Sequence, residues 1–113
     1  MKYAVIDIGS NSVRLMLWAN GTLYKKVITT RLAQGLAASG VICEEASART
    51  VAAIAELAAE GRHEGAIVLA FATAAVRSAK NGCAFCARVK EVCDIEVDVI
   101  AGEEEARLGM YGA

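Results

Sequence analysis

The first candidate for chemistry is a run of small polar residues at 7–12 (DIGSNS), just after an apolar stretch. Asp7 carries a carboxylate that could hold a hydrated divalent cation, and Gly9 lets the backbone approach an anion closely. Hydroxyl and N–H donors follow at three consecutive positions, Ser10, Asn11 and Ser12. This combination suits a loop that binds phosphate, and it is equally typical of an ordinary hairpin turn.

The second candidate is Arg77, which follows the apolar run 66–72 (AIVLAFA). A short and continuously apolar run predicts a strand that is buried on both faces. In open α/β sheets ligands bind outside the carboxyl ends of the strands, and a guanidinium can bind phosphate through two parallel hydrogen bonds. Arg77 is therefore a candidate phosphate ligand. The alternative is an exposed arginine on a short helix.

The third candidate is a row of carboxylates after the last predicted strand, Glu103, Glu104 and Glu105. Acidic residues at a helix start are favoured by the helix dipole, so a solvated helix cap is the ordinary interpretation. One of the three could instead face the same cleft as Asp7 and Arg77 and act as a general base on water. The residue pattern leaves both alternatives open.

The elements that must position these residues begin with three strands, predicted over 2–8, over 12–19 and through 25–30. Asn20 and Gly21 separate the second strand from the third, and Asn-Gly is a strong signal for a two-residue hairpin turn. The first thirty residues therefore predict an antiparallel meander.

Helical periodicity begins at Glu44, and Gly61 is expected to end this first long helix. Its apolar stripe consists of Val51, Ile54, Leu57 and Ala58. A second helix is predicted over 82–93. Its inner stripe consists of Phe85, Val89 and Val92.

Strands at 66–72 and 95–101 alternate with these helices, and a third helix is predicted to open at Gly102. The predicted order is β-β-β-α-β-α-β-α. Two β-α-β crossovers joined to a meander imply an α/β fold, with a mixed five-stranded sheet and helices on its faces.

Composition limits the classes of function. The 113 residues suffice for one compact domain, since domains usually have roughly 100–150 residues. A hydrophobic content of 56% excludes disorder, and a net charge of −1 gives no broad attraction to nucleic acid or to a membrane surface. No apolar run is long enough to span a bilayer, and the amino terminus is a poor secretory signal. We therefore expect a cytoplasmic protein with no nucleic-acid or membrane partner.

The cysteines are expected to be reduced thiols rather than a disulfide scaffold, because the chain lacks an export signal. They are Cys43, Cys83, Cys86 and Cys93. Their spacing does not fit a zinc site, and Cys86 and Cys93 flank the inner stripe of the second helix, where they would pack as apolar residues.

Four segments, in this order and spacing, resemble a known family: AVIDIGSNSVRLML, TRLAQGL, FATAAVRSAKNG and IAGEEEARLGMYGA. The chain resembles the exopolyphosphatase and guanosine pentaphosphate phosphohydrolase (Ppx/GppA) family over its whole length. The resemblance implies a ribonuclease H-like lobe of the actin, sugar kinase and Hsp70 ATPase superfamily. It further implies that residues 1–113 are the amino-terminal lobe of a two-lobed phosphatase, with the second lobe absent from this chain.

The resemblance also implies an activity. The family hydrolyses terminal phosphoanhydride bonds, of inorganic polyphosphate or of guanosine pentaphosphate, with Mg²⁺ as cofactor. By match to the family motifs, Asp7 would hold the metal, Arg77 would contact the transferred phosphoryl group and Glu105 would be the catalytic base. The phosphate loop would consist of Gly9, Ser10, Asn11 and Ser12. Because the active cleft lies between two lobes, we expect this chain alone to be inactive.

The chain departs from the family pattern in two places. Ala33 and Gln34 stand where relatives commonly have Gly-Glu, and Ala74 stands where a small hydroxyl residue is frequent. The sequence does not choose between polyphosphate and guanosine pentaphosphate. Two alternatives stay open: another kinase or ATPase lobe of the superfamily, and a non-catalytic module that binds nucleotide or phosphate. Besides the second lobe, a partner could be another copy of the chain, since an isolated lobe exposes the surface that the missing lobe would cover.

Overall fold

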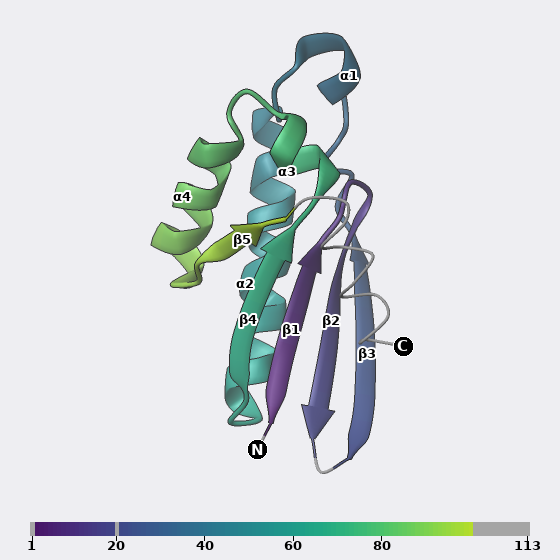
Figure 1. The fold of residues 1–113 in the computed structure, drawn as a ribbon, viewed down its shortest axis with the longest axis vertical. Coiled ribbons are helices and arrows are strands. Elements are labelled where there is room, and N and C mark those ends of the chain that lie inside the picture. The colour runs from purple at the N-terminus through teal and green to yellow at the C-terminus, as the bar shows by residue number, and fades with distance from the viewer. Residues whose placement is uncertain (1, 20, 101–113) are drawn as a thin grey trace.

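The computed structural model describes residues 2–19 and 21–100 of the chain. Within them the strands are β1 (Tyr3–Ile8), β2 (Ser12–Ala19), β3 (Thr22–Thr29), β4 (Ile67–Ala72) and β5 (Val97–Val99) (Figure 1). The helices are α1 (Leu36–Ser39), α2 (Glu44–His63), α3 (Ala74–Ser78) and α4 (Gly82–Cys93). Every strand and helix predicted within these residues has a counterpart, but β5 is shorter than the strand predicted at 95–101, and β3 begins at Thr22, earlier than the predicted 25–30. The third predicted helix lies outside the described residues.

The strands form one mixed sheet in the order β3-β2-β1-β4-β5, which confirms the predicted fold class. β1 and β2 are antiparallel, as are β2 and β3. β4 pairs in parallel with β1, and β5 pairs in parallel with β4. The carboxyl ends of β1, β4 and β5 therefore meet at one edge of the sheet, together with the start of β2.

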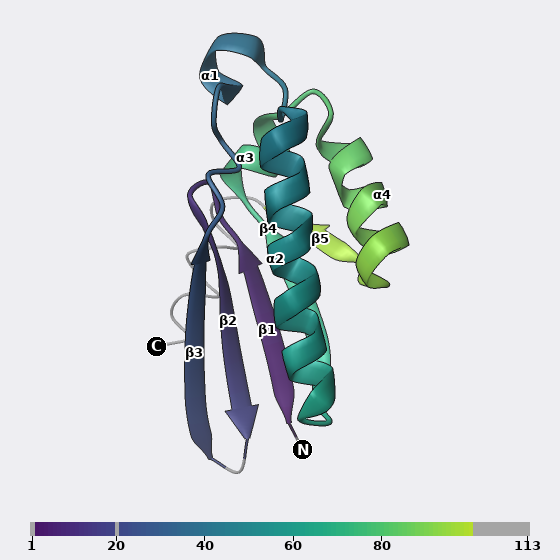
Figure 2. The same cartoon turned by 180° about the vertical axis from the view of Figure 1, so that it is seen from behind.

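The core lies between the sheet and α2, which runs along one face of the strands (Figure 2). Alternate residues of β1 and β2 point toward this helix because successive side chains of a strand face opposite sides. The buried residues from these strands are Ala4, Ile6, Ile8, Val13, Leu15 and Leu17. The predicted stripe of α2, made of Val51, Ile54, Leu57 and Ala58, is buried against them, which confirms the helical period.

The prediction that Gly61 ends the long helix is wrong. Gly61 is a buried residue inside α2, which continues to His63, and the chain turns at Gly65 with a φ of +75°. A Cβ placed on Gly61 would lie 2.7 Å from the Cβ of Ala4. The glycine is needed because α2 crosses β1 closely at this point, a tertiary reason that local sequence does not reveal.

The inner face of α4 differs from the predicted stripe at one position. Phe85 and Val89 are buried as expected, but Val92 is 57% exposed and is not part of the core. Cys93 takes the inner position instead, and its Sγ lies 3.7 Å from the carbonyl oxygen of Val51 on α2. The contact with α2 follows a narrow i, i+4 row along α4, so a residue at the edge of the predicted stripe faces solvent.

The described helices leave the opposite face of the sheet uncovered (Figure 1). Large apolar side chains on that face are exposed. The most exposed are Tyr3, Val27, Ile67 and Leu69, between 39% and 58% accessible. The register places Tyr3 beside Ile67, so these side chains share one face. Among the described residues, no helix is long and apolar enough to cross a membrane.

Candidate functional site

The predicted phosphate loop lies at the sheet edge where β1 and β4 end. A pocket of about 290 Å³ opens there, and it is lined by Asp7, by residues 9–12 and by Arg14, Thr73 and Ala74. The fold therefore brings Asp7 together with all four predicted loop residues. It places them at the carboxyl ends of neighbouring parallel strands, where ligands bind in open α/β sheets.

Gly9 makes the tight closure of this loop possible. Its N–H donates to the carbonyl oxygen of Ser12 at 3.0 Å. A Cβ on Gly9 would lie only 3.0 Å from that same oxygen, which is tighter than ordinary packing allows. The chain can reverse between β1 and β2 in so few residues because position 9 has no side chain.

Two carbonyl groups of the loop, those of Ser10 and Asn11, are held by hydrogen bonds from a neighbouring segment. The N–H groups of Thr30 and Arg31 both donate to the Asn11 carbonyl oxygen, at 3.0 and 2.9 Å, and that of Ala33 donates to the Ser10 carbonyl oxygen at 2.9 Å. Among the described residues, no acceptor binds the N–H groups of Ser10 and Asn11. Successive backbone N–H groups without acceptors are what an anion-binding loop requires.

Arg14 is a site residue that the sequence analysis did not single out. It lies directly across from Asp7 in the register of β1 and β2, and both residues line the pocket. Its exposed guanidinium gives the pocket a positive charge beside the Asp7 carboxylate. The sequence signal that could have identified Arg14 is the short loop between β1 and β2, because the length of this loop determines which residue of β2 lies opposite Asp7.

Thr73 and Ala74 also line the pocket without having been predicted as ligands. Thr73 is buried and immediately follows β4, where it precedes the first residue of α3. Its position is the signal that was available, since it is the first polar side chain beyond the carboxyl end of that strand.

Arg77 does not line this pocket. It lies on the short helix α3, is exposed, and its Nη1 donates to the carbonyl oxygen of Ile100 at 2.6 Å. Ile100 follows β5 and is bound through its own N–H to Ala72. Arg77 thus ties α3 to the end of β5, and its contact with phosphate stays a prediction. The predicted base Glu105 lies outside the described residues, as do Glu103 and Glu104.

The oxygen donors of the pocket fit Mg²⁺ better than a softer metal. Asp7 offers a carboxylate, and hydroxyl and amide oxygens follow at positions 10–12. Mg²⁺ is usually held by one or two carboxylates, with water and substrate phosphates completing its shell. In the described part of the chain no three residues of the His, Cys, Asp and Glu types gather as a ready metal cage. A single carboxylate beside a phosphate loop agrees with the magnesium pattern.

Two cysteines of α4, Cys86 and Cys93, pack at the core, while Cys83 on the same helix is exposed. Burial raises the pKa of the Cys86 thiol, and the neighbouring Cys83 raises it further. Burial also raises the pKa of Cys93, while Arg62 acts in the opposite direction. Both thiols therefore stay protonated at neutral pH, which is unfavourable for zinc binding and for nucleophilic attack.

Comparison with known proteins adds a family match and several relatives. The model of the Ppx/GppA phosphatase family matches residues 19–113. The chain is 33% identical to exopolyphosphatase 1 of Mycobacterium tuberculosis over 115 residues, covering 96% of this chain and 33% of that protein. It is 38% identical to the guanosine-5'-triphosphate,3'-diphosphate pyrophosphatase of Photobacterium profundum over 118 residues, covering 97% and 23% respectively.

Solved structures of the same family also resemble this chain in fold. The Ppx/GppA family member of Aquifex aeolicus superposes with a TM-score of 0.87 at 34% identity, covering 95% of this chain and 37% of that one. The ethanolamine utilization protein EutJ of Carboxydothermus hydrogenoformans, at 14% identity and a TM-score of 0.53, shares the fold alone. The chain spans well under half the length of each of these proteins.

Proposed function

The chain belongs to the Ppx/GppA phosphatase family, and on that basis we propose that it forms one lobe of a phosphohydrolase. Its substrate is the terminal phosphoanhydride bond of inorganic polyphosphate or of guanosine pentaphosphate. The observation that carries the proposal is the loop after β1, where Gly9 closes the turn and no acceptor among the described residues binds the N–H groups of Ser10 and Asn11. Relatives named for each of the two activities match nearly the whole chain, so the choice between the substrates stays open.

In this proposal the loop binds the terminal phosphate through backbone donors and through the hydroxyls of Ser10 and Ser12. Arg14 neutralises part of the substrate charge from the neighbouring strand. Phosphoryl transfer asks mainly for positioning and charge stabilisation, and little covalent chemistry by the protein. A loop of fixed backbone donors supplies both without rearranging when the substrate arrives.

Mg²⁺ is the cofactor that the family resemblance implies, and Asp7 is the residue that would hold it. When bound, Mg²⁺ neutralises negative charge on the phosphate oxygens as that charge moves toward the leaving group. Asp7 lies near the carboxyl end of β1 and lines the same pocket as the loop.

The chemical step requires a base, and the proposal assigns it to Glu105. The carboxylate accepts a proton from water as the water oxygen bonds to the terminal phosphorus, and the bridging P–O bond breaks to release the shortened phosphate chain. Arg77 contacts the transferred phosphoryl group in this proposal. A guanidinium has five N–H donors, so the bond of Arg77 to Ile100 leaves others for phosphate.

The experiment that tests the proposal is a titration of the labelled chain with Mg²⁺ and tripolyphosphate, followed by amide NMR. We expect the largest shifts at Ser10 and Asn11, and little change at Gly65, a turn at the opposite end of the sheet. Tripolyphosphate without Mg²⁺ serves as the control and is expected to bind more weakly. Shifts spread over the surface, or none at millimolar ligand, would count against a preformed phosphate loop.

A further inference from the structure

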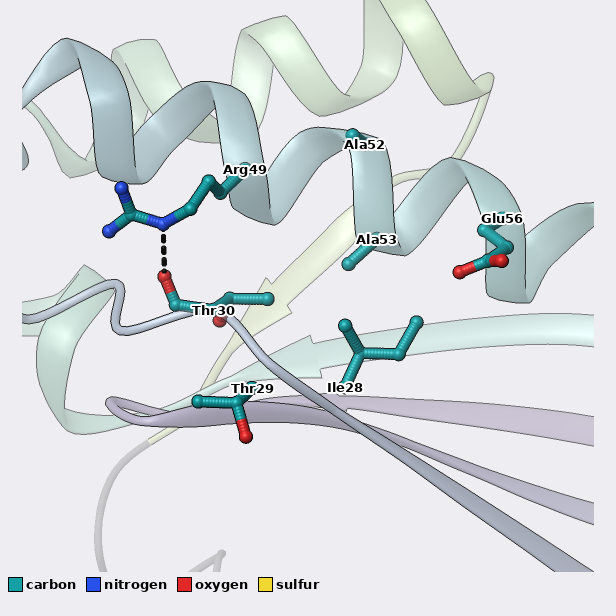
Figure 3. A pocket seen from close by; sticks show the side chains of 7 residues that line it. All are labelled: Ile28, Thr29, Thr30, Arg49, Ala52, Ala53 and Glu56. Atoms are coloured by element: carbon teal, nitrogen blue, oxygen red, sulfur yellow. Dashed lines mark hydrogen bonds between the residues drawn. The ribbon is translucent and has the colours of Figure 1, made fainter.

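Arg49 extends from α2 across the end of a groove of about 540 Å³ between that helix and the edge strand β3 (Figure 3). Ile28 of β3 and Ala53 of α2 face each other across the groove. At the end nearest the phosphate loop, the Nε of Arg49 donates to the Thr30 carbonyl oxygen at 3.0 Å. The same guanidinium makes a second bond, from Nη2 to the Oε1 of Gln34 at 2.6 Å.

Arg49 therefore joins both ends of the segment 30–34, which we call the brace segment. Its middle is fixed by Leu32, whose side chain is completely buried in the core. The position of Thr30 is fixed by hydrogen bonds of its backbone, since its buried hydroxyl has no hydrogen-bond partner in the described part of the chain. The Thr30 N–H binds Asn11, and the Thr30 carbonyl oxygen binds Arg49.

The brace segment also contains a backbone conformation that needs outside support. Arg31 has a φ of +52°, in the left-handed region that residues with a Cβ rarely adopt. Such a conformation persists only where surrounding contacts fix it. This strained residue and its neighbours supply the three N–H groups that hold the carbonyls of Ser10 and Asn11.

Hydrogen bonds thus connect Arg49 to the brace segment, and the brace segment to the carbonyls of Ser10 and Asn11; we call this series of bonds the relay. From it we infer that Arg49 is a positioning residue for the phosphate loop. By holding Thr30 and Gln34 it keeps the brace segment in the conformation that binds the carbonyls of Ser10 and Asn11, and so fixes the peptide groups of the phosphate loop. Arg49 does not touch the pocket itself and acts through two layers of hydrogen bonds. The inference rests on the proposed phosphate-binding role of the loop.

Substitution of Gln34 provides a second, independent test of this series of hydrogen bonds. The bond of Gln34 to Arg49 joins a charged guanidinium to a neutral side-chain amide. Gln34→Glu would make this contact an ion pair, and hydrogen bonds between two charged groups are stronger than those with one neutral partner. The variant should tighten the brace segment and raise the affinity for phosphate, a gain that a purely structural residue would not give.

The test compares Arg49→Met with Arg62→Met in the whole chain. Arg62 is a matched control because it also lies on α2 and also donates to backbone carbonyls, those of Cys93 and Asp94, far from the loop.

Amide hydrogen exchange of Arg31 and Ala33, measured without ligand, reports how firmly the brace segment is held. We expect Arg49→Met to speed this exchange about tenfold, as the loss of two ordinary hydrogen bonds predicts, and to weaken binding of magnesium tripolyphosphate to a similar extent. Arg62→Met should change neither.

Unchanged exchange at Arg31 and Ala33 in Arg49→Met would overturn the inference, whatever the ligand does. Faster exchange in a chain whose parent form does not bind tripolyphosphate would instead refute the proposed function of the loop. If Arg49→Met fails to fold, Gln34→Ala removes one arm of the relay at an exposed position. It must then raise exchange at the same amides, and the inference is wrong if it does not.

Discussion

At the scale of residues, the candidate site combines backbone donors with few charged side chains. Gly9 closes the loop, Asp7 offers the one carboxylate of the described pocket, and Arg14 stands opposite that carboxylate. A polyphosphate substrate carries several negative charges, and in our proposal the guanidinium of Arg14 neutralises part of them beside the loop. The pairing of β1 with β2 fixes the backbone of Arg14 opposite Asp7.

Replacing Arg14 with methionine should therefore weaken binding of magnesium tripolyphosphate about tenfold, since a charge-assisted hydrogen bond to phosphate is lost. The dependence of binding on salt concentration should also weaken, because exposed charges are screened by ions. Calorimetric titration at two salt concentrations measures both effects. Lys25→Met is the control, since Lys25 is an exposed cation on the same face of the sheet, on β3, and does not line the pocket. Equal binding by Arg14→Met and by the parent chain would remove Arg14 from the site.

At the scale of elements, the crossing of α2 over β1 decides how the core is built. Gly61 allows this approach, and the Cβ it lacks would overlap that of Ala4. In an exposed helix interior, Gly→Ala stabilises by about 1 kcal/mol, because alanine is the better helix former. At position 61 steric overlap opposes that gain, and overpacking a tight core typically costs about 1–3 kcal/mol.

We expect Gly61→Ala to destabilise the chain by about 1 kcal/mol or more, despite the higher helix propensity of alanine. Urea unfolding followed by circular dichroism measures the change. Ala59→Gly, at an exposed position of the same helix, provides the comparison and should lose about 1 kcal/mol from propensity alone. A stabilised Gly61→Ala variant would show that the crossing is looser than the contact with Ala4 indicates.

Sequence alone predicted this fold well because the strands and helices have clear periods and the turns have specific residues. Where prediction failed, the deciding contact came from a distant segment. A glycine at position 61 is typical of a helix end, but the close approach of Ala4 and Val68 is the reason that glycine is required there. Arg14 became a site residue through the register of a hairpin, and Arg77 was turned to Ile100 by the pairing of β5. None of these contacts leaves a mark in the local pattern around the residue itself.

At the scale of the whole molecule, the chain spans 33% of the mycobacterial relative and 37% of the Aquifex structure. Large apolar side chains on one face of the sheet are exposed, and the described helices leave that face uncovered. Apolar side chains gathered on an exposed face are typical of an interaction site. These features agree with our proposal that catalysis requires a second lobe.

The chain alone should hydrolyse polyphosphate too slowly to measure, and joining it to the second lobe of the Aquifex family member should produce turnover. In that joined protein, Glu105→Gln should lower the rate by about 10²–10⁴, the usual contribution of a general base. Phosphate release from tripolyphosphate provides the measurement. Glu103→Gln is the matched control, and it should keep nearly full activity. Equal losses in both variants would contradict the assignment of Glu105 as the base.

The phosphate loop has one consequence for how the chain can vary. At Asn11 the proposed anion-binding group is the peptide N–H, which every amino acid except proline possesses. Mutation at position 11 can alter the side chain while leaving that donor in place, whereas position 9 admits no Cβ without moving Ser12. Tolerance to substitution would then be greater at a position that binds the ligand than at the glycine that closes the turn. A mutational scan scored by tolerance alone would rank Asn11 as dispensable and Gly9 as essential.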